Sequence, residues 1–173
     1  MNKQIAVLFG PLGGNAEKVA NTIKNKLGEH NCVLVPVSAA DNALIKKYDR
    51  IIFGVSTIGT HTWTDNKTRS DWDIFLPKFR DIDLSGKHVA IYGLGDQIAY
   101  ANHFVDDMKI VYDIVIQQGG KVIGQWPTEG YDFNDSEAII DNMFVGLAID
   151  EDRQSDLTEE RVNNWIDEIA SIW

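Results

Sequence analysis

The sequence predicts a doubly wound α/β domain, in which a five-stranded parallel sheet lies between two layers of helices. Three observations indicate it: five short apolar segments, helical segments between them, and glycine-containing turns where apolar segments end. Parallel neighbours need a crossover, usually a helix, and helices on both faces leave the strands apolar on both sides. With 173 residues and no internal repeat, the chain is expected to form one domain, residues 1–173.

Apolar runs and the residues that end them define the elements of the first half. Val19, Ile23 and Leu27 recur at helical spacing. Asn15 is the expected N-cap of this helix and Gly28 its C-terminal stop. The expected elements are strands at 4–9, 32–37 and 49–54, and helices at 15–27, 41–47 and 70–79.

The second half continues the alternation until a polar stretch interrupts it. Gly93 follows one apolar strand, and Gly119-Gly120 closes a long helix. Thr158 is the expected N-cap of the last, amphipathic helix. The expected elements are strands at 87–92 and 121–126, a helix at 102–118, a polar segment at 127–142, an apolar segment at 143–149 and a helix at 157–172.

The protein is acidic, with a formal net charge of −10, and the charge is unevenly distributed. Residues 1–127 carry 13 acidic and 14 basic side chains, whereas residues 128–173 carry 13 acidic and 2 basic ones. This argues against binding to nucleic acid or anionic lipid. The acidic segment is either solvated surface or a docking face for a basic partner.

Several classes of protein are excluded or disfavoured by single features. Apolar runs are too short to cross a bilayer, and no signal peptide is expected, so we expect a cytoplasmic protein without membrane attachment. Cys32 cannot form an internal disulfide and is expected to be a buried thiol. The four histidines have no metal-binding spacing, so no metal site is expected. Trp72, Trp126 and Trp165 are expected in the core.

Ligands of such sheets bind outside the carboxyl ends of the strands, which directs attention to loops 10–16, 56–69 and 93–101. The first loop joins a strand to a helix and is rich in glycine, which suits either a phosphate site or a tight turn. It matches neither the Walker motif nor the dinucleotide fingerprint. Its candidate ligand residues are Gly10, Pro11, Leu12, Gly13, Gly14, Asn15 and Ala16.

The other two loops combine aromatic side chains with polar groups. Loop 93–101 places a carboxylate, Asp96, near an aromatic ring, Tyr100. Loop 56–69 contains several hydroxyls and a second ring, Trp63. Aromatic side chains in the loops at one sheet edge suggest a sandwich for a flat heterocycle.

At these residues the chain resembles the flavodoxins of the long-chain type, small electron carriers that bind FMN non-covalently. The resemblance covers almost the whole chain. Its most specific parts are Tyr92-Gly-Leu-Gly-Asp-Gln-Ile-Ala-Tyr100, Trp126-Pro-Thr-Glu-Gly-Tyr-Asp-Phe133 and Phe144-Val-Gly-Leu-Ala-Ile-Asp-Glu-Asp-Arg-Gln-Ser-Asp-Leu-Thr158. It implies a flavodoxin-like, three-layer fold of strand order 2-1-3-4-5, in which an insertion interrupts the fifth strand.

The resemblance also implies positions for a flavin ring. Tyr100 and Trp63 match the aromatic residues on either side of it, although a rival alignment places Ile58 where the tryptophan stands. Gly95 and Asp96 would present backbone groups to its pyrimidine edge. Besides loop 10–16, the implied cofactor-binding residues are Ser56, Thr57, Thr62, Trp63, Thr64, Leu94, Gly95, Asp96, Tyr100, Asn102, His103 and Asp150.

The first loop departs from the family pattern, in which hydroxyl side chains help to hold the FMN phosphate. Pro11, Gly13 and Ala16 stand where hydroxyls are usual, and Pro11 also lacks an amide donor. Either hydroxyls of segment 56–62, such as Thr57, Thr60 and Thr62, replace the missing donors, or the cleft accepts a ligand without phosphate. We expect a retained flavin.

The resemblance implies a low-potential one-electron carrier, with no catalytic residues, that shuttles between a flavodoxin or ferredoxin reductase and acceptor proteins. Asp150 begins an acidic cluster whose charge would help to lower the potential. A monomer is expected. Two alternatives stay open: a binding or regulatory module with lost or weakened FMN binding, and an FMN-dependent reductase.

Overall fold

Five parallel strands form the central sheet in the order β2-β1-β3-β4-β5, which confirms the predicted order. The computed structural model describes residues 4–58 and 70–173. The apolar runs of the sequence become the buried inner strands of the sheet. The strands are β1 (Ile5–Gly10), β2 (Cys32–Pro36), β3 (Arg50–Val55), β4 (His88–Leu94) and β5 (Lys121–Ile123).

The fifth strand is interrupted, as the resemblance implies. His88 to Ala90 of β4 pair with β5, whereas Tyr92 to Leu94 pair with β9 (Leu147–Ile149). The chain between these two pieces forms a small antiparallel sheet of order β6-β8-β7. Its strands are β6 (Trp126–Pro127), β7 (Ile139–Ile140) and β8 (Met143–Phe144).

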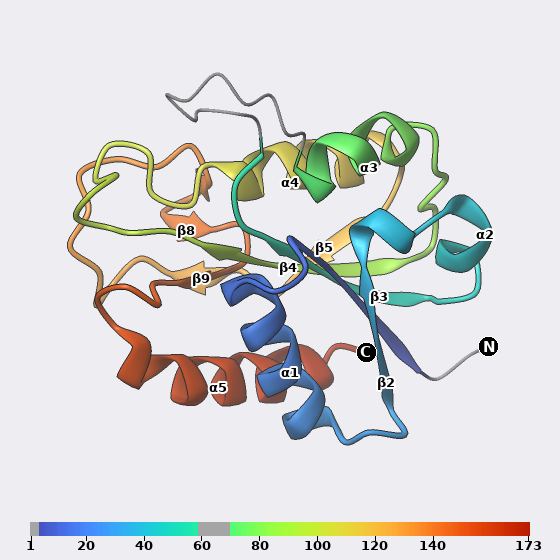
Figure 1. Cartoon of the computed structure of the whole chain (residues 1–173), viewed down its shortest axis with the longest axis horizontal. Coiled ribbons are helices and arrows are strands. Elements are labelled where there is room, and N and C mark those ends of the chain that lie inside the picture. The colour runs from blue at the N-terminus through green and yellow to red at the C-terminus, as the bar shows by residue number, and fades with distance from the viewer. Residues whose placement is uncertain (1–3, 59–69) are drawn as a thin grey trace.

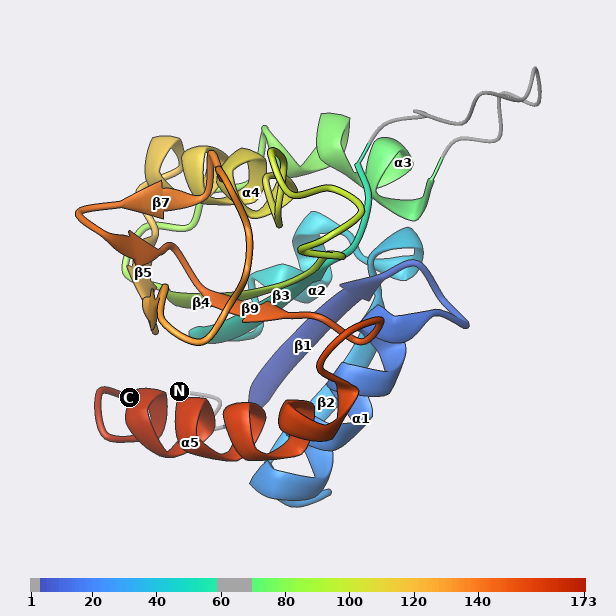
Figure 2. The same cartoon turned by 90° about the vertical axis from the view of Figure 1, so that its left-hand side faces the viewer.

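Helices cover both faces of the sheet (Figure 1). Helices α1 (Asn15–Leu27) and α5 (Thr158–Ala170) pack together on one face, while α3 (Asp71–Phe79) and α4 (Asp107–Gln117) cover the other (Figure 2). Shorter helical turns are η1 (Val37–Ala39), α2 (Asn42–Ile45) and η2 (Ser155–Leu157). None of the helices in the described parts of the chain is long and apolar enough to span a bilayer.

Two of the three tryptophans expected in the core are fully buried. The indole nitrogen of Trp72 donates to the carbonyl of Gly54 at 3.1 Å, and that of Trp165 donates to the carbonyl of Gly124 at 2.8 Å. Trp126 is only partly buried, because it lies in β6 at the start of the insertion. Cys32 is buried as expected, and burial raises the pKa of its thiol to about 11.

Two expected helix caps are wrong. Gly14, not Asn15, occupies the N-cap position of α1. Thr158 is the first residue of α5, where its hydroxyl donates to the Glu151 carboxylate instead of capping the helix.

Helix α4 begins at Asp107, five residues later than the expected start at residue 102. The segment before it is a series of turns, in which the His103 amide donates to the Tyr100 carbonyl at 2.9 Å. Val105 adopts a φ of 53°, which is incompatible with a continuous right-handed helix. Apolar spacing alone does not reveal such a residue.

Candidate functional site

The register of the sheet brings the three candidate loops to one edge. Gly10 of β1 lies opposite Val55 of β3, and Val55 lies opposite Gly93 of β4. Leu94 in turn lies opposite Ile149, the last residue of β9. Loops 10–16, 56–69 and 93–101 therefore begin side by side with segment 150–154, at the carboxyl edge where α/β sheets bind ligands.

Asp96 organises the loop that follows β4. Its carboxylate accepts hydrogen bonds from the amides of Ile98 and Ala99, at 3.0 and 2.9 Å, and its carbonyl accepts from the Tyr100 amide at 3.0 Å. These bonds close the turn that presents Tyr100, whose side chain is 66% exposed. A large aromatic ring is thus held on an ordered turn at the carboxyl edge.

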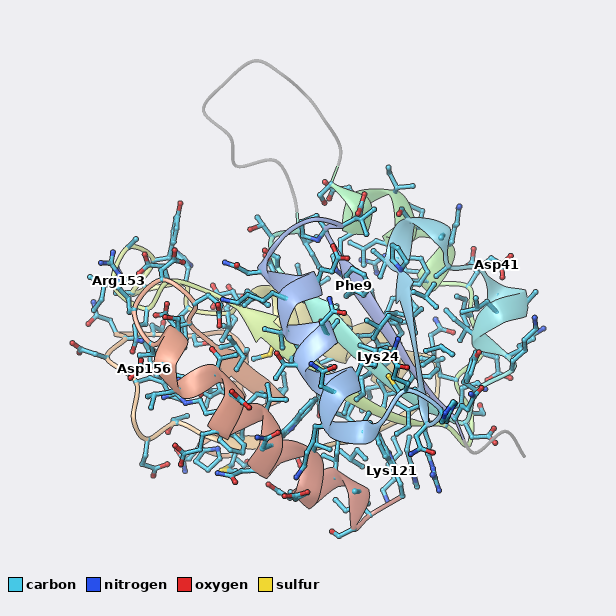
Figure 3. The ribbon with its side chains drawn as sticks, turned by 60° about the horizontal axis from the view of Figure 1, so that its bottom comes forward. Phe9, Lys24, Asp41, Lys121, Arg153 and Asp156 are labelled. Atoms are coloured by element: carbon cyan, nitrogen blue, oxygen red, sulfur yellow. The ribbon has the colours of Figure 1, made fainter. Side chains whose placement is uncertain are left out.

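Arg153 fixes the same loop from outside. Its guanidinium donates to both carboxylate oxygens of Asp96, through Nε and Nη2, at 3.1 Å each. Figure 3 shows Arg153 at the end of the molecule where α5 begins. The hydrogen bond from Arg153, followed by that from the Ala99 amide, lowers the pKa of the Asp96 carboxyl to about 2.

Asp150 supports the loop from within the protein, and its assignment as a cofactor contact stays a prediction. Its carboxylate is fully buried and accepts from the amide and the side chain of Gln97, at 3.0 and 2.8 Å. It also accepts from the amides of Asp152 and Arg153, at 3.0 and 2.9 Å. These four hydrogen bonds join segments 96–100 and 150–154.

Three further residues that were predicted to contact the cofactor form hydrogen bonds within the protein. The Gly95 amide donates to the Ile149 carbonyl at 3.0 Å, so in this arrangement that amide belongs to the sheet. Asn102 accepts a hydrogen bond from Asn134 of the insertion at 3.1 Å, and Nδ1 of His103 lies 3.0 Å from the Asp106 carboxylate. Asn102 and His103 therefore fasten the insertion and the turns before α4.

Two carboxylates accept hydrogen bonds from backbone amides of the loop after β1. The Leu12 amide donates to the Asp71 carboxylate at 3.0 Å, and the Gly13 amide donates to the Glu17 carboxylate at 2.6 Å. Asp71 is the first residue of α3, and Glu17 is the third residue of α1. Neither residue was predicted from the sequence. For Glu17 a signal exists, because an acidic residue at the third helical position commonly accepts a hydrogen bond from an amide just before the helix.

The first amides of α1 remain as donors in this loop. The earliest backbone bond of the helix runs from the Lys18 amide to the Gly14 carbonyl at 3.2 Å. The described residues supply no acceptor to the amides of Asn15, Ala16 and Glu17, which is the usual state of a helix N-terminus and suits an anion.

The side chains of this loop provide few hydrogen-bond donors for an anion. Leu12 is 59% exposed, whereas Ala16 is fully buried. Gly13 has a φ of 81°, a conformation that a threonine adopts only with strain. Restoring the family's hydroxyls at Gly13 and Ala16 would therefore disturb the backbone and the core.

The second loop is described only at its beginning. Ser56 and Thr57 follow β3, and the Ile58 amide donates to the Asp107 carboxylate at 2.8 Å, with the Ile58 side chain packed on the core beneath α3 and α4. Thr62, Trp63 and Thr64 lie outside the described residues, so their assignments stay predictions.

The described residues contain no group of three or more histidine, cysteine, aspartate or glutamate side chains that could hold a metal ion. What the edge does offer is an exposed aromatic ring, two further exposed apolar side chains, and amides at a helix start. The apolar side chains are Leu12 and Ile98. This combination suits a flat, partly apolar ligand better than a metal ion or a highly charged one.

Comparison with known proteins decides the family. The flavodoxin family model matches residues 7–165. The chain belongs to the flavodoxin family. A flavodoxin from Nostoc sp. is 41% identical over 171 residues, which cover 99% of this chain and 98% of the relative. Flavodoxin 1 from Escherichia coli is 38% identical over 165 residues, covering 95% and 91%.

Solved flavodoxins share the architecture of this family member. The flavodoxin of Fusobacterium nucleatum bound to flavin mononucleotide is 30% identical, covers 99% of each chain and superposes with a TM-score of 0.86. Its K13G mutant, also bound to flavin mononucleotide, gives a TM-score of 0.87 and covers the whole of this chain. The insertion between β5 and β9 is the feature by which the sequence resembles the long-chain flavodoxins.

Proposed function

We propose that this flavodoxin is a one-electron carrier that binds FMN non-covalently at the carboxyl edge of its sheet. The observation that carries the proposal is the exposed ring of Tyr100, held on a turn that Asp96, Arg153 and Asp150 fix. A rigid ring at this edge supplies a platform for a planar cofactor. A family member with the same fold, the flavodoxin of Fusobacterium nucleatum, binds flavin mononucleotide both unmodified and as its K13G mutant, which supports the choice of ligand.

The residues fit the flavin ring better than its phosphate. Tyr100 would stack on the ring, and the carbonyl groups of its turn would face the polar edge of the ring. The N-terminal amides of α1 would receive the phosphate, together with Ser56, Thr57 and Thr62 of the second loop. FMN supplies the redox chemistry when bound, and the chain orients it and limits the access of water.

The partners we propose are a flavodoxin or ferredoxin reductase and acceptor proteins that approach through basic surfaces. The excess of acidic side chains in residues 128–173 supports such docking, because opposite charges speed encounter. A low potential, a monomeric state and a cytoplasmic location belong to the same proposal. A cofactor-free regulatory module and an FMN-dependent reductase are the competing functions, and no observation favours either.

The visible spectrum of the purified protein, followed by titration with FMN, tests the proposal. We expect the absorption bands of an oxidised flavin and complete quenching of added FMN at a one-to-one ratio. A colourless protein that leaves FMN fluorescence unchanged at high concentration would support the cofactor-free module. Steady oxidation of NAD(P)H by the isolated, flavin-loaded protein would support the reductase.

A further inference from the structure

We propose that the carboxylates of Glu17 and Asp71 are specificity determinants that oppose the phosphate of FMN, so that this site accepts riboflavin nearly as well as FMN. The inference rests on the proposed function and concerns which form of the flavin the site selects. It is carried by the two hydrogen bonds from loop amides to these carboxylates, at 2.6 and 3.0 Å.

The first step concerns the donors that an incoming phosphate needs. Loop 10–16 contains no side-chain hydroxyl and no basic residue, and Pro11 has no amide hydrogen. Backbone amides and the side-chain amide of Asn15 are therefore the donors of the loop. The amides of Leu12 and Gly13 are already bonded to Asp71 and Glu17, so a phosphate that used them would have to displace a carboxylate from each.

The second step concerns charge. Phosphate bound at the first amides of α1 would lie next to two carboxylates that the loop itself holds in place, and like charges at short range repel. The nearest lysine along the chain, Lys18, does not offset them, because its ammonium pairs with the Glu151 carboxylate, whose side chain is only 3% exposed. Among the described residues, the local charge thus favours a flavin that carries no anion.

The third step concerns the described apolar side chains of the site, which do not discriminate by charge. Tyr100, Ile98 and Leu12 are exposed large side chains that would meet the ring and its chain through apolar contact. Those contacts are available to FMN and riboflavin alike. Selectivity between the two flavins is therefore decided at the phosphate end, where the carboxylates act.

The competing explanation is that Glu17 and Asp71 only stabilise the loop. An acidic side chain at the third helical position commonly accepts from an amide just before the helix. In that case neutralising the carboxylates would loosen the loop and weaken both flavins by the same factor. The two explanations therefore predict different effects on the ratio of the two dissociation constants.

The decisive experiment titrates FMN and riboflavin into the full chain and into the double variant Glu17→Gln/Asp71→Asn, with fluorescence as readout. In the unmodified protein we expect the two dissociation constants to lie within about tenfold of each other. In the double variant FMN should bind at least roughly tenfold tighter, because two repelling charges are gone, whereas riboflavin should change by less than about twofold. The control is Glu29→Gln/Glu168→Gln, which removes two exposed carboxylates at the far ends of α1 and α5 and should leave the ratio unchanged.

A second measurement needs no flavin and guards against a variant that folds poorly. Titration with inorganic phosphate, followed by the amide ¹⁵N and ¹H shifts of residues 12–17, should saturate at lower phosphate concentration in the double variant. The inference would be overturned if the double variant changed the dissociation constants of FMN and riboflavin by the same factor. It would also be overturned if the unmodified protein bound FMN a thousandfold tighter than riboflavin. Neither result would contradict the proposed function as an electron carrier. Failure of both flavins to bind any variant would instead overturn the proposed function, and this inference with it.

Discussion

The hydroxyl of Tyr92 donates a hydrogen bond of 2.6 Å to the carbonyl oxygen of Ala16. Tyr92 is fully buried on β4, and Ala16 is the second residue of α1, so the bond ties the first candidate loop to the strand that leads into the third. Gly54 makes room for the ring, because a Cβ at that position would lie 2.1 Å from Tyr92.

Replacing Tyr92 by phenylalanine should lower the free energy of unfolding by about 1–2 kcal/mol, because the Ala16 carbonyl loses its donor. Burial also raises the pKa of Tyr92 well above its ordinary value. The stability that the protonated phenol contributes is therefore complete below the unfolded pKa of about 10 and declines as the pH rises beyond it. Urea denaturation at pH 7 and pH 11 should show a steeper loss in the unmodified protein than in Tyr92→Phe, and equal slopes would contradict this role.

Replacing Asp150 by alanine should lower the free energy of unfolding by about 2–4 kcal/mol, because the buried amide and side chain of Gln97 lose their acceptor. The matched control is Asp152→Ala, an exposed neighbour, for which we expect a change within about 0.5 kcal/mol. Urea denaturation measures both. Similar values for the two variants would show that Asp150 does not support the loop.

The ion pair between Asp96 and Arg153 should make stability depend on pH in the acid range. The pKa of Asp96 is lowered to about 2 in the folded protein, against about 4 in the unfolded chain. Its contribution is therefore complete above about pH 4 and is lost as the pH falls through about 2. Chemical denaturation between pH 5 and pH 2.5 should give a weaker pH dependence for Asp96→Asn, while Asp141→Asn, at an exposed turn, should behave like the unmodified protein.

Tyr100 should contribute to flavin binding by stacking. Tyr100→Ala is expected to weaken the FMN complex by about 1–3 kcal/mol, taking the stacking of bases on aromatic side chains as the guide. Tyr100→Phe keeps the ring and serves as the control, with a change below about 0.5 kcal/mol. Fluorescence titration measures both. An unchanged affinity for FMN in Tyr100→Ala would show that the flavin ring does not stack on Tyr100.

Electron transfer to a basic reductase should slow as salt rises from low to physiological concentration. Exposed charges more than about 8–10 Å apart are screened under those conditions, so an acidic docking face loses its attraction. Stopped-flow reduction of the flavin-loaded protein at several salt concentrations measures this. A rate indifferent to salt would indicate that the acid-rich segment 128–173 is only solvated surface.

The fold class could be predicted from the sequence, because apolar periodicity and glycine stops are local signals. The sequence predicted the bounds of α1, although not its N-cap, whereas the resemblance to the flavodoxins implied the order of the five strands and the interruption of the fifth. It also selected the three loops that the register brings to one edge, since parallel strands end on the same side.

Tertiary structure decided which side chains of those loops are available. Asp150 and Ala16 stand in the predicted set, but packing buries both of them. Arg153 and Asp71 reach the loops from segments distant in sequence, 57 residues from Asp96 and 59 residues from Leu12, so no local pattern identifies their partners. Exposure and long-range hydrogen bonds arise only when the chain is folded, because they depend on which surfaces meet in space.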